Sequence, residues 1–225
     1  GYIEVLAEAA NAQGFRSGFE ISDLYFLRAM PVKDGQLRDI RLTLKAESTG
    51  FTAELRSDCV FAGKPGWQLH AQALLSKVNS AAKPVDLKSI LARCNVSEVA
   101  EKGVPIAARQ EVHLNFGPQW QVLRETHIGD AEGVARLSLA PDLRDTLAQG
   151  HILHAGLFDI ATGWAMDLVP GYDASHLWVP VSYGKITVHD ALPGEIQSWV
   201  RLSETQQDDG FASFDVTIAA PDGRV

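Results

Sequence analysis

The chain has 225 residues, 46% of them hydrophobic, and a formal net charge of −8. This length suits one large domain or two small ones with a sizeable core. The basic residues are scattered, which argues against nucleic acid or an anionic membrane surface as a partner. No stretch has the roughly 20 apolar residues of a membrane span, and we expect no signal peptide. The two cysteines, Cys59 and Cys94, lie far apart and suit free thiols in a reducing compartment, so we expect a cytoplasmic protein.

The first part of the chain predicts one helix followed by several strands. Residues 3–13 carry apolar side chains at helical spacing, and Gly14 suits the end of this helix. Apolar or alternating segments then predict strands at residues 21–29, 37–45, 51–56 and 67–75. Residues 81–84 have the composition of a linker, residues 86–93 predict a short helix, and residues 98–110 have the composition of a loop.

The second part of the chain repeats this order. Residues 154–168 predict a helix with one apolar stripe, formed by Leu157, Ala161, Trp164, Ala165 and Leu168. Strands are predicted at residues 178–188, 195–202 and 211–219. A helix followed by antiparallel strands, twice over, indicates an α+β protein built from a repeat.

Two such units would cover their open strand edges by pairing with each other. We therefore predict a double hotdog, in which an antiparallel sheet wraps around two central helices. The predicted division is a first hotdog unit at residues 1–95, a linker at residues 96–110 and a second hotdog unit at residues 111–225.

Asp159 is the first candidate for chemistry. It lies near the start of the second predicted helix, within the apolar segment HILHAGLFDIATGW. The positive end of the helix dipole favours a carboxylate, whereas burial favours the neutral acid. These opposing effects leave a carboxyl group able to donate or accept a proton, as a catalytic acid needs. From spacing alone, a capping or surface-paired aspartate is the more frequent alternative.

The segment FGPQWQ, residues 116–121, is the second candidate. Its Gly-Pro pair predicts a fixed turn before an aromatic strand. Such a turn would form the floor of an acyl pocket, although a plain strand entry is the more frequent use. The seven histidines have no zinc-site spacing and lie away from the cysteines, so we expect no metal.

Four segments resemble blocks of the dehydratase domains of modular polyketide synthases. LHAGLFD resembles the His-Pro-x-Leu-Leu-Asp block, and Asp159 takes the place of its catalytic aspartate. FGPQWQ is similar to Tyr-Gly-Pro-x-Phe-Gln, with Gly117, Pro118 and Gln121 matching. WVPVSYGKITVH is similar to a Leu-Pro-x-Ser-Trp block, and GYIEVLAEAA resembles the helix after the family's first signature. The blocks run over nearly the whole chain, and their order is more specific than any one block.

Three positions depart from these blocks. Ala155 replaces the proline that follows the block histidine, His154, and Phe116 replaces the tyrosine of the Gly-Pro block. Gly163 stands where the family often has Gln or His, four residues after Asp159. A side chain that would orient the aspartate is therefore missing at this position.

The resemblance implies a dehydration. A histidine, expected upstream of Gly1, would take the α-proton of a β-hydroxyacyl thioester, and Asp159 would protonate the hydroxyl group as it leaves as water. The substrate would arrive on the phosphopantetheine arm of an acyl carrier protein, so the domain would need no cofactor or metal of its own. The implied partners are this carrier protein, the neighbouring synthase domains and a second copy in a homodimer. The implied substrate-binding residues are Tyr2, Phe116, Gly117, Pro118, His154 and Gly163.

Three alternatives stay open. The first is a double-bond isomerase or pyran-forming cyclase on the same fold, and the second is a catalytically inactive structural domain. The third is a free-standing hotdog thioesterase or hydratase acting on coenzyme A, which the ordered blocks disfavour. Substrate chain length and stereochemistry depend on pocket shape, which these patterns do not define.

Overall fold

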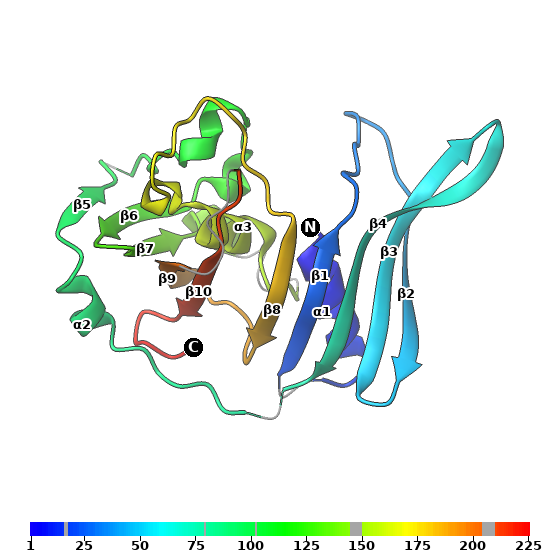
Figure 1. The fold of residues 1–225 in the computed structure, drawn as a ribbon, viewed down its shortest axis with the longest axis horizontal. Coiled ribbons are helices and arrows are strands. Elements are labelled where there is room, and N and C mark those ends of the chain that lie inside the picture. Colours follow the sequence, from blue (N-terminus) through cyan, green and yellow to red (C-terminus); the bar gives the residue numbers. More distant parts are fainter. Residues whose placement is uncertain (16–17, 79, 102, 145–149, 204–209) are drawn as a thin grey trace. The chain divides into compact units, whose positions relative to one another are not determined.

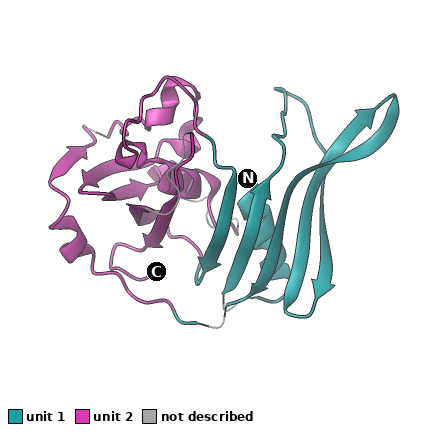
Figure 2. Ribbon diagram, viewed as in Figure 1, with its two compact units in different colours: residues 1–81, 179–190 teal, residues 82–178, 191–225 magenta. Residues whose placement is uncertain are grey.

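The chain forms two compact units, coloured separately in Figure 2. The computed structural model describes residues 1–15, 18–78, 80–101, 103–144, 150–203 and 210–225. Unit 1 comprises Gly1–Ala81 and Val179–Asp190, and unit 2 comprises Ala82–Trp178 and Ala191–Val225. The predicted division into a first hotdog unit at residues 1–95, a linker at residues 96–110 and a second hotdog unit at residues 111–225 was drawn from the sequence repeat, and it stays a prediction. None of the described helices is long and apolar enough to span a bilayer.

Unit 1 combines one helix with a five-stranded antiparallel sheet (Figure 1). Helix α1 spans Tyr2–Ala12 and buries Leu6, Ala7 and Ala10. These three residues share one helical face because they are three or four positions apart. The sheet has the order β2-β3-β4-β1-β8. Its strands are β1 Phe19–Phe26, β2 Ile40–Glu47, β3 Gly50–Phe61, β4 Lys64–Lys77 and β8 Ser182–Val188.

Strand β8 belongs to the sheet of unit 1 although it follows most of unit 2 in the sequence. It pairs antiparallel with β1, so that Phe19 lies opposite Val188 and Tyr25 lies opposite Ser182. The other edge of β1 is paired with β4. Strand β8 therefore covers an edge of β1 that would otherwise present unpaired backbone groups.

Unit 2 also has a helix and a five-stranded antiparallel sheet, with the strand order β10-β9-β7-β6-β5 (Figure 1). Helix α3 spans Ala155–Gly163. The strands are β5 Val96–Val99, β6 Leu123–Ile128, β7 Glu132–Ser138, β9 Glu195–Leu202 and β10 Phe214–Ala219. The shorter helical elements are α2 Leu87–Leu91, η1 Arg109–Val112, η2 Pro118–Trp120 and η4 Met166–Leu168.

Helix α3 contributes to the core of unit 2, against β7 and β9. All members of the predicted apolar stripe belong to the buried core, namely Leu157, Ala161, Trp164, Ala165 and Leu168. The single helix predicted at residues 154–168 is too long, because α3 ends at Gly163 and residues 166–168 form the separate 3-10 helix η4. A buried hydroxyl group links this helix to β9. Ser198 Oγ donates to the carbonyl oxygen of Ala161 at 2.6 Å and accepts from Trp164 Nε1 at 3.2 Å. The polar groups in this part of the core are therefore satisfied.

Several predicted elements are confirmed, and others were missed. The predicted helix at residues 3–13 and strand at residues 195–202 correspond to α1 and β9. Strand β7 was not predicted, because it contains Gly133, which weakens a strand pattern. The fixed turn predicted at the Gly-Pro pair is found as the 3-10 turn Pro118–Trp120, closed by a hydrogen bond of 3.0 Å from the amide of Trp120 to the carbonyl of Gly117. The strand predicted after it is not aromatic: Trp120 belongs to the turn, and β6 begins only at Leu123.

Candidate active site

Asp159 lies on the face of α3 that points away from the core of unit 2. Leu157 and Ile160 are buried in the core on either side of it, whereas Asp159 is exposed. A residue two positions after Leu157 is rotated by about 200° around the helix, which explains this difference. The expected burial of Asp159 is therefore not found. The helix presents its carboxylate to solvent, on the second turn of a nine-residue helix.

The turn η2 approaches α3 so closely that glycine is required at position 156. A Cβ atom on Gly156 would lie 2.0 Å from the carbonyl oxygen of Gln119 and 3.2 Å from the amide nitrogen of Trp120. Both atoms belong to the backbone, so they cannot move aside as a flexible side chain could. The direct contact of the two backbones sets the distance between the turn and the helix.

Trp120 belongs to the turn η2, and its side chain contacts the candidate catalytic residue Asp159 on α3. Its indole Nε1–H donates a hydrogen bond to Asp159 Oδ2, with a distance of 2.9 Å. The ring of Phe116 stacks with the indole at a centroid distance of 6.4 Å and an interplanar angle of 8°. Both rings also pack against the core of unit 2. The structure thus brings the segment around Gly117 and Pro118 next to the helix that carries Asp159.

Sequence reasoning singled out the segment FGPQWQ but gave Trp120 no role. The available signal was a Trp where the family block has Phe, because the indole adds one hydrogen-bond donor. The acceptor lies 39 positions away in the sequence, so no local pattern connects the two residues.

His154 caps the N-terminus of α3. Its Nδ1 accepts a hydrogen bond of 3.4 Å from the amide of Leu157, and its own side chain is only 3% exposed. Because Nδ1 is an acceptor here, the neutral ring carries its proton on Nε2. The ring of His151 meets that of His154 edge to face, with centroids 6.2 Å apart. This arrangement supports the start of the helix that carries Asp159.

Gly163 is the last residue of α3 and lies one helical turn after Asp159. A Cβ atom placed on Gly163 would meet no atom within 4 Å. The residue therefore leaves open space beside the aspartate, because side chains four positions apart are neighbours on a helix.

Tyr2 is the first residue of α1, in unit 1. Its ring lies 5.9 Å from that of Phe26 and 6.3 Å from that of His70. Partial burial raises the pKa of the Tyr2 hydroxyl, although a backbone hydrogen bond involving Met30 opposes this shift. His70 is buried, with Nε2 2.9 Å from Ser57 Oγ and Nδ1 3.1 Å from the carbonyl oxygen of Arg28.

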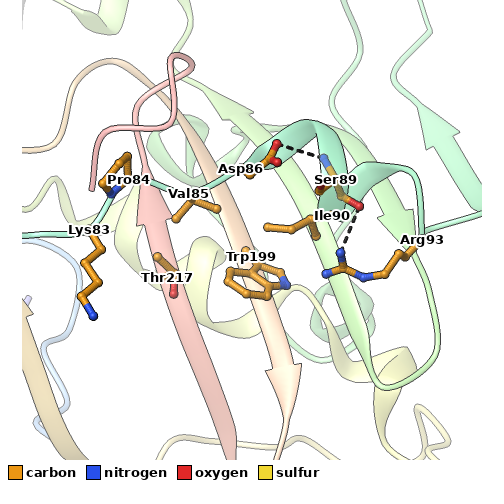
Figure 3. Close-up of a pocket in the computed structure, with 9 residues that line it drawn as sticks. All are labelled: Lys83, Pro84, Val85, Asp86, Ser89, Ile90, Arg93, Trp199 and Thr217. Atoms are coloured by element: carbon orange, nitrogen blue, oxygen red, sulfur yellow. Dashed lines mark hydrogen bonds between the residues drawn. The ribbon is translucent and has the colours of Figure 1, made fainter.

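A surface pocket of about 420 Å³ lies elsewhere in unit 2 (Figure 3). It is formed between α2, its preceding segment and the strands β9 and β10, and none of the predicted site residues lines it. The lining residues are Lys83, Pro84, Val85, Asp86, Ser89, Ile90, Arg93, Trp199 and Thr217. One rim is fixed by the ion pair of Arg93 with Glu132, whose atoms Nε and Oε1 are 2.7 Å apart.

Comparison with known proteins shows which family the chain matches. Residues 83–225, more than half of the chain, match the family model described as the polyketide synthase dehydratase N-terminal domain. Polyketide synthase PksN of Bacillus subtilis (strain 168) is 24% identical over 198 residues. This similarity covers 88% of the present chain but only 4% of the length of PksN.

Solved dehydratase structures have the same fold. The dehydratase domain from the CurJ module of the curacin polyketide synthase matches 99% of this chain and 76% of its own, with a TM-score of 0.83 and 19% identity. A trans-AT polyketide synthase dehydratase domain from Brevibacillus brevis matches 99% and 79%, respectively, with a TM-score of 0.83 and 18% identity. A trans-acyltransferase polyketide synthase enoyl-isomerase matches 99% and 83%, with a TM-score of 0.75 and 12% identity.

The fold is the α+β double hotdog that the repeat predicted. The chain belongs to the polyketide synthase dehydratase family. The resemblance inferred from the four sequence blocks is thereby confirmed.

Proposed function

We propose that this chain removes water from a β-hydroxyacyl thioester and that Asp159 is the proton donor. One observation carries the assignment of Asp159. Its carboxylate is exposed on α3, away from the core, and the indole of Trp120 holds it at 2.9 Å. It also occupies the aspartate position of the block LHAGLFD. A carboxyl group held in one orientation and open to solvent can reach a bound hydroxyl group.

The reaction breaks two bonds and forms one π bond in the acyl chain. A base removes the proton from the α-carbon, and the electron pair of that C–H bond becomes the second bond between the α- and β-carbons. The β-carbon loses its hydroxyl group, which takes the proton of Asp159 and leaves as water. The base is the histidine expected upstream of Gly1. Donor and base thus need different proton states at the same pH.

The acyl group is proposed to arrive on the phosphopantetheine arm of an acyl carrier protein. Tethering raises the effective concentration of the substrate, so weak docking of the carrier protein is sufficient. The chemistry transfers protons and breaks one C–O bond, so no further cofactor is proposed. The neighbouring synthase domains and a second copy of the chain are the other proposed partners. Cys59 and Cys94 are free thiols, which suits the proposed cytoplasmic location.

The proposed substrate contacts lie near Asp159 and in unit 1. Gly117 and Pro118 form the start of the turn against α3, and Phe116 supports that turn through its stack with Trp120. The remaining proposed contacts are Tyr2, His154 and Gly163. His154 is buried and caps the N-terminus of α3. Its main expected role is therefore to hold the start of the helix that carries Asp159.

Isomerisation of a double bond is the second candidate function, because an enoyl-isomerase has the same fold. Fold similarity does not separate the two reactions. Product analysis does, since dehydration changes the mass of the acyl group by one water and isomerisation does not.

The test is the substitution Asp159→Asn in the protein at its natural full length. With a β-hydroxyacyl group on the carrier protein as substrate, we expect the rate of water loss to fall by about 100-fold or more, because a positioned acid contributes about 10²–10⁴-fold. Mass spectrometry of the carrier-bound acyl group measures the rate. An unchanged rate would refute the role of Asp159.

Asp167→Asn is the matched control for the same chemical change. Asp167 is also in unit 2, and its Oδ2 is paired with Arg109 Nε at 2.8 Å. We expect this variant to keep the wild-type rate, which would show that loss of an unrelated carboxylate in this unit is tolerated.

A further inference from the structure

We propose that Trp120 is a positioning residue that holds the carboxyl group of Asp159 in its reactive orientation. The inference rests on the proposed role of Asp159 as proton donor. It adds a residue that acts through the aspartate without touching the substrate.

The hydrogen bond selects one of the two carboxyl oxygens. Trp120 Nε1–H donates to Asp159 Oδ2 at 2.9 Å. Among the described residues, this is the only hydrogen bond to the side chain of Asp159. The indole nitrogen is a donor and never an acceptor. Oδ2 therefore serves as the acceptor, and the transferable proton is directed to the other carboxyl oxygen, Oδ1.

The indole is itself held in place by its surroundings. Phe116 stacks on it with nearly parallel rings, and the amide of Trp120 closes the turn on the carbonyl of Gly117 at 3.0 Å. The backbone contact at Gly156 fixes this turn against α3. Donor and acceptor thus come from two elements whose spacing is set by packing, and the exposed aspartate loses much of its rotational freedom.

On α3, the hydroxyl of Thr162 donates to the backbone carbonyl oxygens of Phe158 and Asp159, at 3.0 and 3.2 Å, and not to the carboxyl group of Asp159. The position one turn later is Gly163, where a Cβ atom would meet nothing within 4 Å. A side chain at that position would be a neighbour of Asp159. Trp120 therefore supplies from the facing turn the hydrogen bond that Gly163 cannot supply from the helix. The same open space provides a way to test the inference, because a new donor can be built there.

The test compares two Trp→Phe substitutions in the full-length protein. Trp120→Phe keeps an aromatic ring for the stack with Phe116 and removes only the N–H donor. Trp199→Phe is the matched control, because Trp199 Nε1 also donates to a carboxylate at 2.9 Å, that of Glu132 in the same unit. We expect Trp120→Phe to lower kcat about ten-fold with KM changed less than about two-fold, since the indole N–H stabilises the negative charge that develops on Asp159 as its proton leaves, and one such hydrogen bond corresponds to about a tenfold rate change. Trp199→Phe should keep the wild-type kcat.

Rescue separates positioning from a merely structural effect. In a Gly163→Gln background, the new amide can donate to the carboxyl group of Asp159, and we expect the penalty of Trp120→Phe to fall below about three-fold. An equal penalty in both backgrounds would overturn the inference. So would a kcat for Trp120→Phe equal to that of Trp199→Phe.

A spectroscopic measurement keeps the inference testable if Trp120→Phe does not fold. Ultraviolet resonance Raman spectra of the wild type and of Asp159→Ala should differ in the band that reports indole N–H hydrogen bonding. Identical bands would mean that the hydrogen bond is not formed in solution and would overturn the inference. If Asp159→Asn keeps full activity, the proposed function itself fails. If Asp159→Asn is inactive and both Trp→Phe variants match the wild type, only the role of Trp120 fails.

Discussion

The contact between η2 and α3 makes a strong prediction for Gly156→Ala. The new Cβ atom would lie 2.0 Å from the carbonyl oxygen of Gln119, whereas real Cβ contacts are essentially never shorter than 3.0 Å. The turn or the helix must therefore move by about 1 Å. Trp120 and Asp159 lie on the two sides of this contact, so the same movement lengthens their hydrogen bond.

The expected cost follows from two opposing effects. Overpacking costs about 1–3 kcal/mol or more, and the upper end applies because the obstacle is backbone. Alanine is a better helix residue than glycine by about 1 kcal/mol, which offsets part of this cost. The net loss is about 2 kcal/mol, and for a chain of this size it lowers Tm by about 4–8 °C.

Thermal unfolding followed by circular dichroism measures this effect, and dehydration kinetics measure its consequence for the site. Gly163→Ala is the matched control, because it lies on the same helix with no atom within 4 Å of the added Cβ. We expect its Tm to equal or exceed that of the wild type. A Tm for Gly156→Ala as high as that of Gly163→Ala would refute the reasoning from the backbone contact.

Two further predictions concern the core and the charge pairs of unit 2. Ser198→Ala leaves the buried indole N–H of Trp164 without its acceptor, and we expect a loss of about 2 kcal/mol in urea unfolding. The hydrogen bond from Arg93 lowers the pKa of Glu132 below its ordinary value of 4.5. This contribution to stability is present above pH 4.5 and is lost as the pH falls through the lower, folded-state pKa. Acid should therefore destabilise the wild type more steeply than Glu132→Gln, and parallel urea midpoints between pH 5 and pH 2 would contradict this.

Local sequence patterns predicted the helices and strands whose buried residues recur at the helical or strand period. Leu157 and Ala161 are buried because they recur at the helical period of α3, and this pattern is visible without knowledge of any partner. In β9, Ile196 and Val200 alternate with outward residues for the same reason. Strand β6 has no such pattern, since its four central residues, at positions 124–127, are all polar, and its bounds were not predicted.

The sequence by itself determined the family, the repeat of helix and strands, and the position of Asp159 on the second helix. Each of these depends on residue types at short spacing or on the order of blocks. Only the tertiary structure decided that β8 joins the sheet of β1 and that Trp120 donates to Asp159. These contacts join segments far apart in the chain, and their partners are selected by packing, here by the approach of two backbones at Gly156.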